Sequence, residues 1–133
     1  MRILGIDYGD RKIGLAFGES TAGVALPLEV ITNNGDETIK DLAKKVHLEN
    51  MDQIVVGVPL ANGGHHGPEQ LQKTQAFIGR LRAAVAVPVF EEDESYTTSE
   101  SIRLQREEGA VAEEDALAAM LILEQFFSRR FEE

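Results

Sequence analysis

The apolar positions of the chain follow two periods, one typical of strands and the other typical of helices. Residues 2–16 hold two apolar runs with a short polar stretch between them that contains Gly9. This pattern predicts two antiparallel strands joined by a tight turn, with Asp7 where the first strand ends. A third strand is predicted over residues 24–31. Pro27 inside it indicates an edge of the sheet, because proline cannot donate a ladder hydrogen bond.

The middle of the chain alternates between helical and strand patterns. Apolar residues at helical spacing follow Asp36, which is predicted to be the N-cap residue of a helix. Residues 53–58 form a short apolar run, typical of a strand that is covered on both faces. A second helix is predicted over residues 67–84 and a fifth strand over residues 85–90. Pro88 places that fifth strand at the other edge of the sheet.

Two further helices complete the predicted α/β fold. Thr97 and Glu100 fit a capping box, so a third helix is expected to begin near Thr97. A last helix with a wide apolar face is expected from about residue 113 to residue 127. This order of strands and helices along the chain predicts a five-stranded mixed sheet flanked by about four helices. Strands one to three would be antiparallel, while strands one, four and five would be parallel and end at the edge where sites gather.

Length and composition narrow the class of protein. The chain has 133 residues, no cysteine and a net charge of −10. We expect a single domain over residues 1–133, in a reducing compartment. Without an apolar stretch long enough for a membrane span or a signal peptide, a cytoplasmic protein without a membrane partner is expected. The acidic charge opposes nucleic-acid binding unless metal ions cancel local carboxylates or a basic patch is present.

Three carboxylates are candidates for chemistry at the predicted edge of the sheet. Asp7 either stabilises its own turn or binds a metal, and Glu94 belongs to an acidic loop that is ordinarily just solvated. Asp115 shares a helix face with apolar residues, and a carboxylate there needs a partner such as a cation. Carboxylates converging from separate elements favour Mg²⁺ or Mn²⁺. Two such ions roughly 4 Å apart can activate water and stabilise the leaving oxygen of a phosphodiester.

Another interpretation rests on the glycines of the first turn. The spacing of Gly9 and Gly14 resembles the phosphate-cradling turn of actin-like and sugar-kinase ATPases. Those proteins close two such domains around ATP, and this chain holds only one.

Four motifs stand in order along the chain: Gly5-Ile6-Asp7-Tyr8-Gly9 with residues 11–16, residues 55–60 with Asn62-Gly63, Asp93-Glu94 before Thr97-Thr98, and residues 115–119. Through these motifs nearly the whole chain resembles the YqgF/RuvX family, which has an RNase H-like fold and is known both as Holliday junction resolvases and as pre-16S rRNA nucleases. The resemblance implies that Asp7, Glu94 and Asp115 are the catalytic, metal-binding acids of a Mg²⁺- or Mn²⁺-dependent hydrolase. It implies a nuclease that processes the 5′ end of pre-16S rRNA during ribosome biogenesis, or one that acts on branched DNA.

The chain departs from the family beside its second acid. Ser95 and Tyr96 stand where the family has arginine and leucine, which removes a phosphate contact, although Tyr96 could stack on a base. A junction resolvase would be a homodimer, whereas the RNA nuclease could be a monomer, and a non-catalytic module that binds nucleic acid or a nucleotide is a third alternative. The residues expected to contact nucleic acid are Arg11, Lys12, Asn62, Lys73 and Tyr96, and Arg80, Arg103 and Arg106 are further members of a candidate basic patch.

Overall fold

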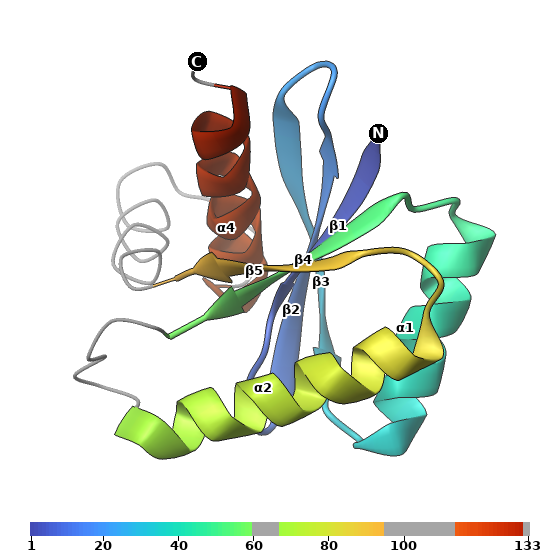
Figure 1. Ribbon diagram of the computed structural model, residues 1–133, viewed down its shortest axis with the longest axis vertical. Helices are drawn as coiled ribbons and strands as arrows, with labels where there is room; N and C mark the ends of the chain where they lie inside the picture. Colours follow the sequence, from blue (N-terminus) through green and yellow to red (C-terminus); the bar gives the residue numbers. More distant parts are fainter. Residues whose placement is uncertain (60–66, 95–113, 132–133) are drawn as a thin grey trace.

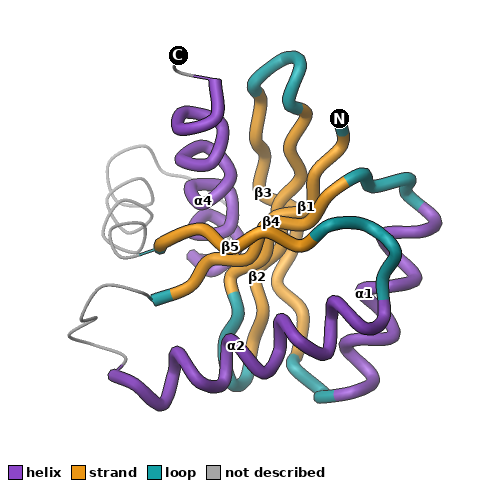
Figure 2. Tube along the Cα trace, viewed as in Figure 1, coloured by secondary structure: helices purple, strands orange, loops and turns teal. Residues whose placement is uncertain are grey.

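A five-stranded mixed sheet lies between helices in the computed structural model, which describes residues 1–59, 67–94 and 114–131 (Figures 1 and 2). The strands stand in the order β3-β2-β1-β4-β5. They are β1 (Arg2–Asp7), β2 (Lys12–Glu19), β3 (Val24–Thr32), β4 (Gln53–Val58) and β5 (Val89–Asp93). The helices of the described chain are α1 (Asp36–Leu48), α2 (Gly67–Ala84) and α4 (Glu114–Phe131).

The strand directions confirm the topology predicted from the sequence. β2 runs antiparallel to both β1 and β3, whereas β4 runs parallel to β1 and to β5. β3 and β5 are the two edge strands, as the prolines in or near them predict. β1, β4 and β5 therefore end at the same edge of the sheet.

Two local predictions were wrong. β5 spans Val89–Asp93 rather than residues 85–90. It begins later because Pro88 has no N–H to donate, although the carbonyl oxygen of Pro88 accepts a hydrogen bond from Ile54 N. Asp36 is not the N-cap residue but the first residue of α1; Gly35 occupies the cap position with a φ of 65°. The predicted helix near Thr97 lies outside the described residues.

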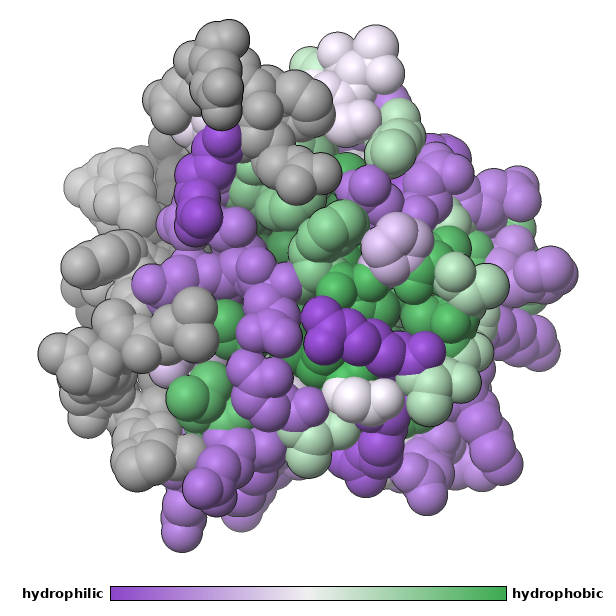
Figure 3. All heavy atoms as spheres, in the orientation of Figure 1, coloured by the Kyte–Doolittle hydropathy of each residue, from purple (hydrophilic) through white to green (hydrophobic). Residues whose placement is uncertain are grey.

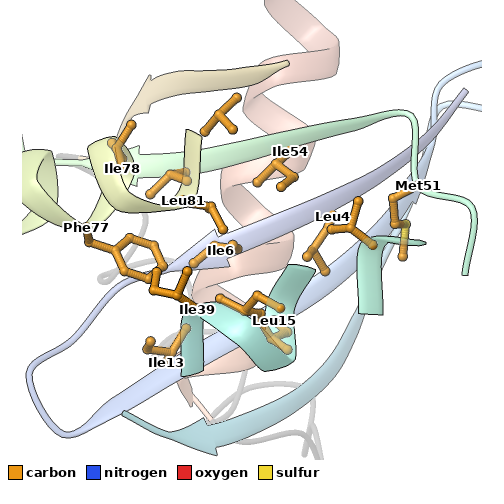
Figure 4. Packing of buried hydrophobic residues seen from close by; sticks show 14 of the residues in the cluster. Leu4, Ile6, Ile13, Leu15, Ile39, Met51, Ile54, Phe77, Ile78 and Leu81 are labelled. Carbon is orange, nitrogen blue, oxygen red and sulfur yellow. The ribbon is translucent and has the colours of Figure 1, made fainter. Parts of the chain in front are cut away.

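Alternate residues of the central strands enter two separate cores. One core lies under α1 and α2, where Leu4 and Ile6 of β1 pack with Phe77 and Leu81 (Figure 4). The other lies under α4, on the opposite face, and includes Ile3 and Val55 among its residues. Figure 1 shows α4 separated by the sheet from the two other helices.

Glycine residues let α4 lie directly on the sheet. A Cβ atom at Gly5 would stand 2.6 Å from Leu123 Cγ, and one at Gly18 would stand 2.8 Å from Phe127 Cζ. Such distances are closer than side chains tolerate, so the helix axis can approach β1 and β2 only because these positions lack side chains. The close approach fixes where α4 begins relative to the end of β1.

The surface is mostly polar on the face shown in Figure 3, with apolar side chains visible among polar ones near its middle. Among the described helices, none combines the length and the apolar character that a membrane span requires.

Candidate active site

A cavity of about 320 Å³ opens at the edge where β1 and β5 end and α4 begins. Five of its lining residues are acidic: Asp7, Asp10, Glu94, Glu114 and Asp115. Tyr8, Gly9, Lys12, Gln70 and Ala118 complete the wall. Larger hollows of about 550, 420 and 360 Å³ occur elsewhere. The hollow of about 420 Å³ also has acids in its wall, among them Glu29, but Lys44 and Lys45 line the same wall. The excess of carboxylates therefore distinguishes the smaller cavity.

Asp7 is the last residue of β1 and stands at the centre of this cavity. Its Cα pairs with that of Gly14 across β1 and β2, and its side chain is partly buried. The turn that follows is held by Asn33, whose Nδ2 donates to Gly9 O over 2.9 Å. This hydrogen bond ties the turn to the start of the chain segment after β3, independently of the Asp7 carboxylate.

Glu94 comes directly after β5 and is held by the backbone of β4. Its N–H donates to Val58 O over 2.9 Å, which extends the parallel pairing of the two strands by one bond. Its Oε2 lies against Gly57 of β4, where an added Cβ atom would be 3.1 Å away. The side chain thus turns back over the sheet toward β1.

Asp115 is brought to the cavity by the close contact of α4 with β2. The carbonyl group of Asp115 lies directly over Gly14, and a Cβ atom there would overlap with the carbonyl oxygen. Because Gly14 is also the residue opposite Asp7, this one contact brings the first turn of α4 to the end of β1. The spacing of Gly9 and Gly14 is therefore explained by packing: Gly9 serves the turn and Gly14 accommodates the helix.

The acidic side chains affect one another's protonation. Burial raises the pKa of Asp7 well above its ordinary value, and the charge of Glu94 and a side-chain hydrogen bond with Glu94 raise this pKa further. The charges of Asp115 and Glu114 act in the same direction. Burial and the neighbouring acids therefore all favour the protonated form of Asp7.

The cavity offers oxygen ligands, which hard divalent cations prefer. Within the described ranges, no three acidic or histidine side chains already stand close enough together to form a ligand set. The residues that could hold an ion are Asp7, Glu94, Asp115 and Glu114.

The basic residues predicted to contact nucleic acid lie at the mouth of the cavity where the structure describes them. Lys12 lines the wall, and Arg11 is exposed in the turn before it. Lys73 of α2 is also exposed and forms an ion pair of 3.2 Å with Asp10. Arg80 lies farther along α2 and is 3.7 Å from Asp36. Asn62, Ser95, Tyr96, Arg103 and Arg106 fall outside the described residues.

Sequence reasoning missed three residues of the cavity wall. Glu114 was assigned only to the favourable electrostatics of a helix start, and neither Asp10 nor Gln70 was singled out. Asp10 follows the Gly9 of the first motif, and Gln70 stands three residues before Lys73, so both are near residues that were selected. Only the approach of α2 to the β1–β2 turn shows that they face the same space.

The mixed sheet of order β3-β2-β1-β4-β5, with helices on both faces (Figure 1), gives this protein an RNase H-like fold. Two solved structures share this fold: Thermus thermophilus RuvC in complex with a Holliday junction and the Fowlpox virus resolvase with junction DNA. Each has a TM-score of 0.62, with 18% and 13% sequence identity, and covers 98% of this chain. The alignments span 95% and 99% of those chains.

The chain belongs to the RuvX family, whose model, described as "Holliday junction resolvase", matches residues 1–129. Curated relatives carry the name "Putative pre-16S rRNA nuclease". One from Polaromonas sp. is 35% identical over 92% of this chain and 85% of its own length. Another, from Desulforudis audaxviator, is 33% identical over 98% of this chain and 96% of its own length.

Proposed function

We propose that this protein is a metal-dependent nuclease that hydrolyses phosphodiester bonds, and that its substrate is the 5′ end of pre-16S ribosomal RNA during ribosome biogenesis. The observation that carries the proposal is the convergence of Asp7, Glu94 and Asp115 from separate elements on one cavity. The pKa of Asp7 is raised by burial and by the three acids Glu94, Asp115 and Glu114 around it. Surplus negative charge concentrated in one cavity is the arrangement that a divalent cation would stabilise.

We assign the binding of Mg²⁺ or Mn²⁺ to Asp7, Glu94 and Asp115. Their donor chemistry fits these ions, because all three supply carboxylate oxygens from separate elements to one cavity. When bound, such ions activate water and stabilise the leaving oxygen of a phosphodiester. The protein's part is to hold the three carboxylates in place and to exclude other cations by size and charge. No side chain is needed as the general base.

Lys12 and Arg11 would bind the phosphates next to the scissile bond. Lys12 lines the cavity, and Arg11 is exposed beside it on the β1–β2 turn. A basic turn at the mouth of an acidic cavity would supply the local attraction for nucleic acid that an average charge of −10 hides. Lys73, Asn62 and Tyr96 are proposed as further contacts.

The choice of RNA rests on the names of the curated relatives, which refer to pre-16S rRNA. Branched DNA is the second candidate, since the family model is described as a Holliday junction resolvase. A junction resolvase must cut two strands symmetrically and would act as a homodimer, whereas an RNA-processing nuclease can act as a monomer. In either case we place the reaction in the cytoplasm, where both substrates would be found.

The deciding experiment incubates the protein with Mn²⁺ and two labelled substrates, a precursor RNA that spans the 5′ end of 16S rRNA and a four-way DNA junction. Asp7→Asn is compared with wild type, and Asp41→Asn is the control, since Asp41 is an exposed acid of α1 outside the cavity. We expect Mn²⁺-dependent cleavage of the RNA by wild type and Asp41→Asn, and a loss of at least 100-fold in Asp7→Asn.

Equal cleavage by wild type and Asp7→Asn, or none by either, would overturn the proposal. Cleavage confined to the junction, by a dimeric protein, would favour the DNA resolvase instead. Binding of RNA without cleavage, and without any stabilisation by Mn²⁺, would identify a non-catalytic module.

A further inference from the structure

A buried acid of β5 is held by two side chains of α4, although the cavity does not include it. Glu92 is only 4% exposed. Its Oε2 accepts hydrogen bonds from Gln125 Nε2 at 2.6 Å and from Arg129 Nη1 at 2.9 Å. Gln125 and Arg129 lie one helical turn apart on α4, so they approach β5 from the same side.

Gln125 also binds the backbone next to the candidate catalytic acid. Its Nε2 donates to Asp93 O over 2.7 Å. The N–H of the same peptide group, which belongs to Glu94, donates to Val58 O over 2.9 Å. The peptide group between Asp93 and Glu94 is thus held on both sides, by β4 through its N–H and by α4 through its carbonyl oxygen.

This double attachment matters because β5 is an edge strand and ends here. Among the described strands, β4 alone pairs with β5, so the described sheet offers no strand that could donate a hydrogen bond to the Asp93 carbonyl oxygen. Gln125 replaces such a strand at the last peptide group before Glu94. The buried carboxylate of Glu92 orients the amide of Gln125, and Arg129 supplies the positive charge that a buried carboxylate requires.

From this geometry we infer that Gln125 is a positioning residue for Glu94, with Glu92 and Arg129 as the pair that orients it. Rotation of the Asp93–Glu94 peptide group would move the Glu94 carboxylate relative to Asp7. The inference rests on the proposed function, because its consequence is the affinity of the cavity for a divalent cation. Groups that orient metal ligands commonly change metal affinity by about 10–100-fold when they are removed.

The test measures Mn²⁺ binding by calorimetry on the intact protein without nucleic acid, well below the melting temperature of every variant. Gln125→Met keeps the length of the side chain but removes its hydrogen-bond donor, and Gln125→Lys restores a donor. Ser128→Ala changes an exposed residue of the same helix. Ile39→Val removes one methyl group from the core under α1 and controls for a general loss of stability.

We expect Gln125→Met to raise the Kd for Mn²⁺ about 10-fold, Gln125→Lys to restore most of the affinity, and both controls to bind as wild type does. A merely structural role predicts that Gln125→Met melts earlier but binds Mn²⁺ with the wild-type Kd, which would overturn the inference alone. If wild type itself bound no Mn²⁺ and cleaved no substrate, the proposed function would fail and this inference with it.

Discussion

Asp7 and Glu94 interact in the cavity, and the charge of Glu94 adds to the effect of burial in raising the pKa of Asp7. They come from β1 and from the end of β5, which β4 separates in the sheet. A proton on Asp7 reduces the repulsion among the acids of the cavity. Binding a divalent cation would release this proton, so metal affinity and pH are coupled at this site.

This coupling predicts how pH affects the stability of the metal-free protein. The pKa of Asp7 is raised in the folded state by burial and by Glu94. The stabilising effect of the proton is therefore complete below the unfolded-state pKa and is lost as pH rises through the raised folded-state pKa. Asp7→Asn carries no charge at any pH, so its free energy of unfolding should exceed that of wild type increasingly from pH 5 to pH 8.

Denaturant unfolding in EDTA at a series of pH values measures this difference. We expect it to grow as pH rises and to be visible at pH 8 as a higher Tm of Asp7→Asn than of wild type. Asp41→Asn, at an exposed site, should differ from wild type by the same small amount at every pH. A difference between Asp7→Asn and wild type that did not change with pH would contradict the electrostatic description of the cavity.

Adding metal should reverse the order of stability. A cation that binds only the folded state at 100 times its Kd stabilises it by about 2.7 kcal/mol. We expect Mn²⁺ to raise the Tm of wild type accordingly, and to leave that of Asp7→Asn nearly unchanged. Thermal melts with and without Mn²⁺ check this, and EDTA should return wild type to its metal-free Tm. An equal shift in both proteins would place the binding of Mn²⁺ elsewhere.

Gly14 offers a test of how α4 reaches the site. The carbonyl group of Asp115 lies directly over Gly14, so Gly14→Ala must push the first turn of α4 away from β2. We expect a loss of about 1–3 kcal/mol in the free energy of unfolding, together with weaker Mn²⁺ binding.

Gly79→Ala is the matched control for that substitution. Gly79 lies in α2 with open space around it, so alanine there should stabilise the helix by up to about 1 kcal/mol. Denaturant unfolding and Mn²⁺ titration of both variants give the comparison. Normal Mn²⁺ binding by a folded Gly14→Ala protein would show that the contact does not position Asp115.

The order and direction of the strands could be predicted from the sequence because they depend on local patterns. The apolar run of Gln53–Val58 and the hairpin around Gly9 each specify their own element. Pro27 and Pro88 correctly indicate the sheet edges. The start of β5 was misplaced, because residues 85–88 are apolar enough for a strand and only the missing N–H of Pro88 prevents it.

The contacts that hold the candidate site residues in place could not be predicted from local sequence patterns, because they join distant parts of the chain. Gln125 binds a carbonyl group 32 residues away, and nothing in the helical pattern of α4 distinguishes it from a surface glutamine. Gly14 likewise looks like part of a turn motif until α4 is placed on it. Asp7 was selected at a strand end, Glu94 in the loop after the last strand, and Asp115 on a helix face that it shares with apolar residues, whereas Glu114 looked like an ordinary helix-start acid.

The ion pair between Lys73 and Asp10 leads to a last prediction about substrate binding. The two side chains are 3.2 Å apart, and each is about half exposed, at 51% and 52%. Exposed ion pairs of this kind are worth little, so Lys73 can exchange Asp10 for a phosphate group at small cost. Asp10 lines the cavity and would repel the same phosphate.

We therefore expect opposite effects from the two partners, measured by fluorescence anisotropy with labelled RNA at several salt concentrations in an Asp7→Asn background. Lys73→Ala should weaken binding and reduce the slope of log K against log salt by about 1. Asp10→Asn should tighten binding, because it removes a negative charge and frees the ammonium group. Lys40→Ala, on the exposed surface of α1, is the control for loss of any lysine. Equal effects of Lys73→Ala and Lys40→Ala would mean that only the overall charge matters, and that the mouth of the cavity makes no specific contact with the nucleic-acid backbone.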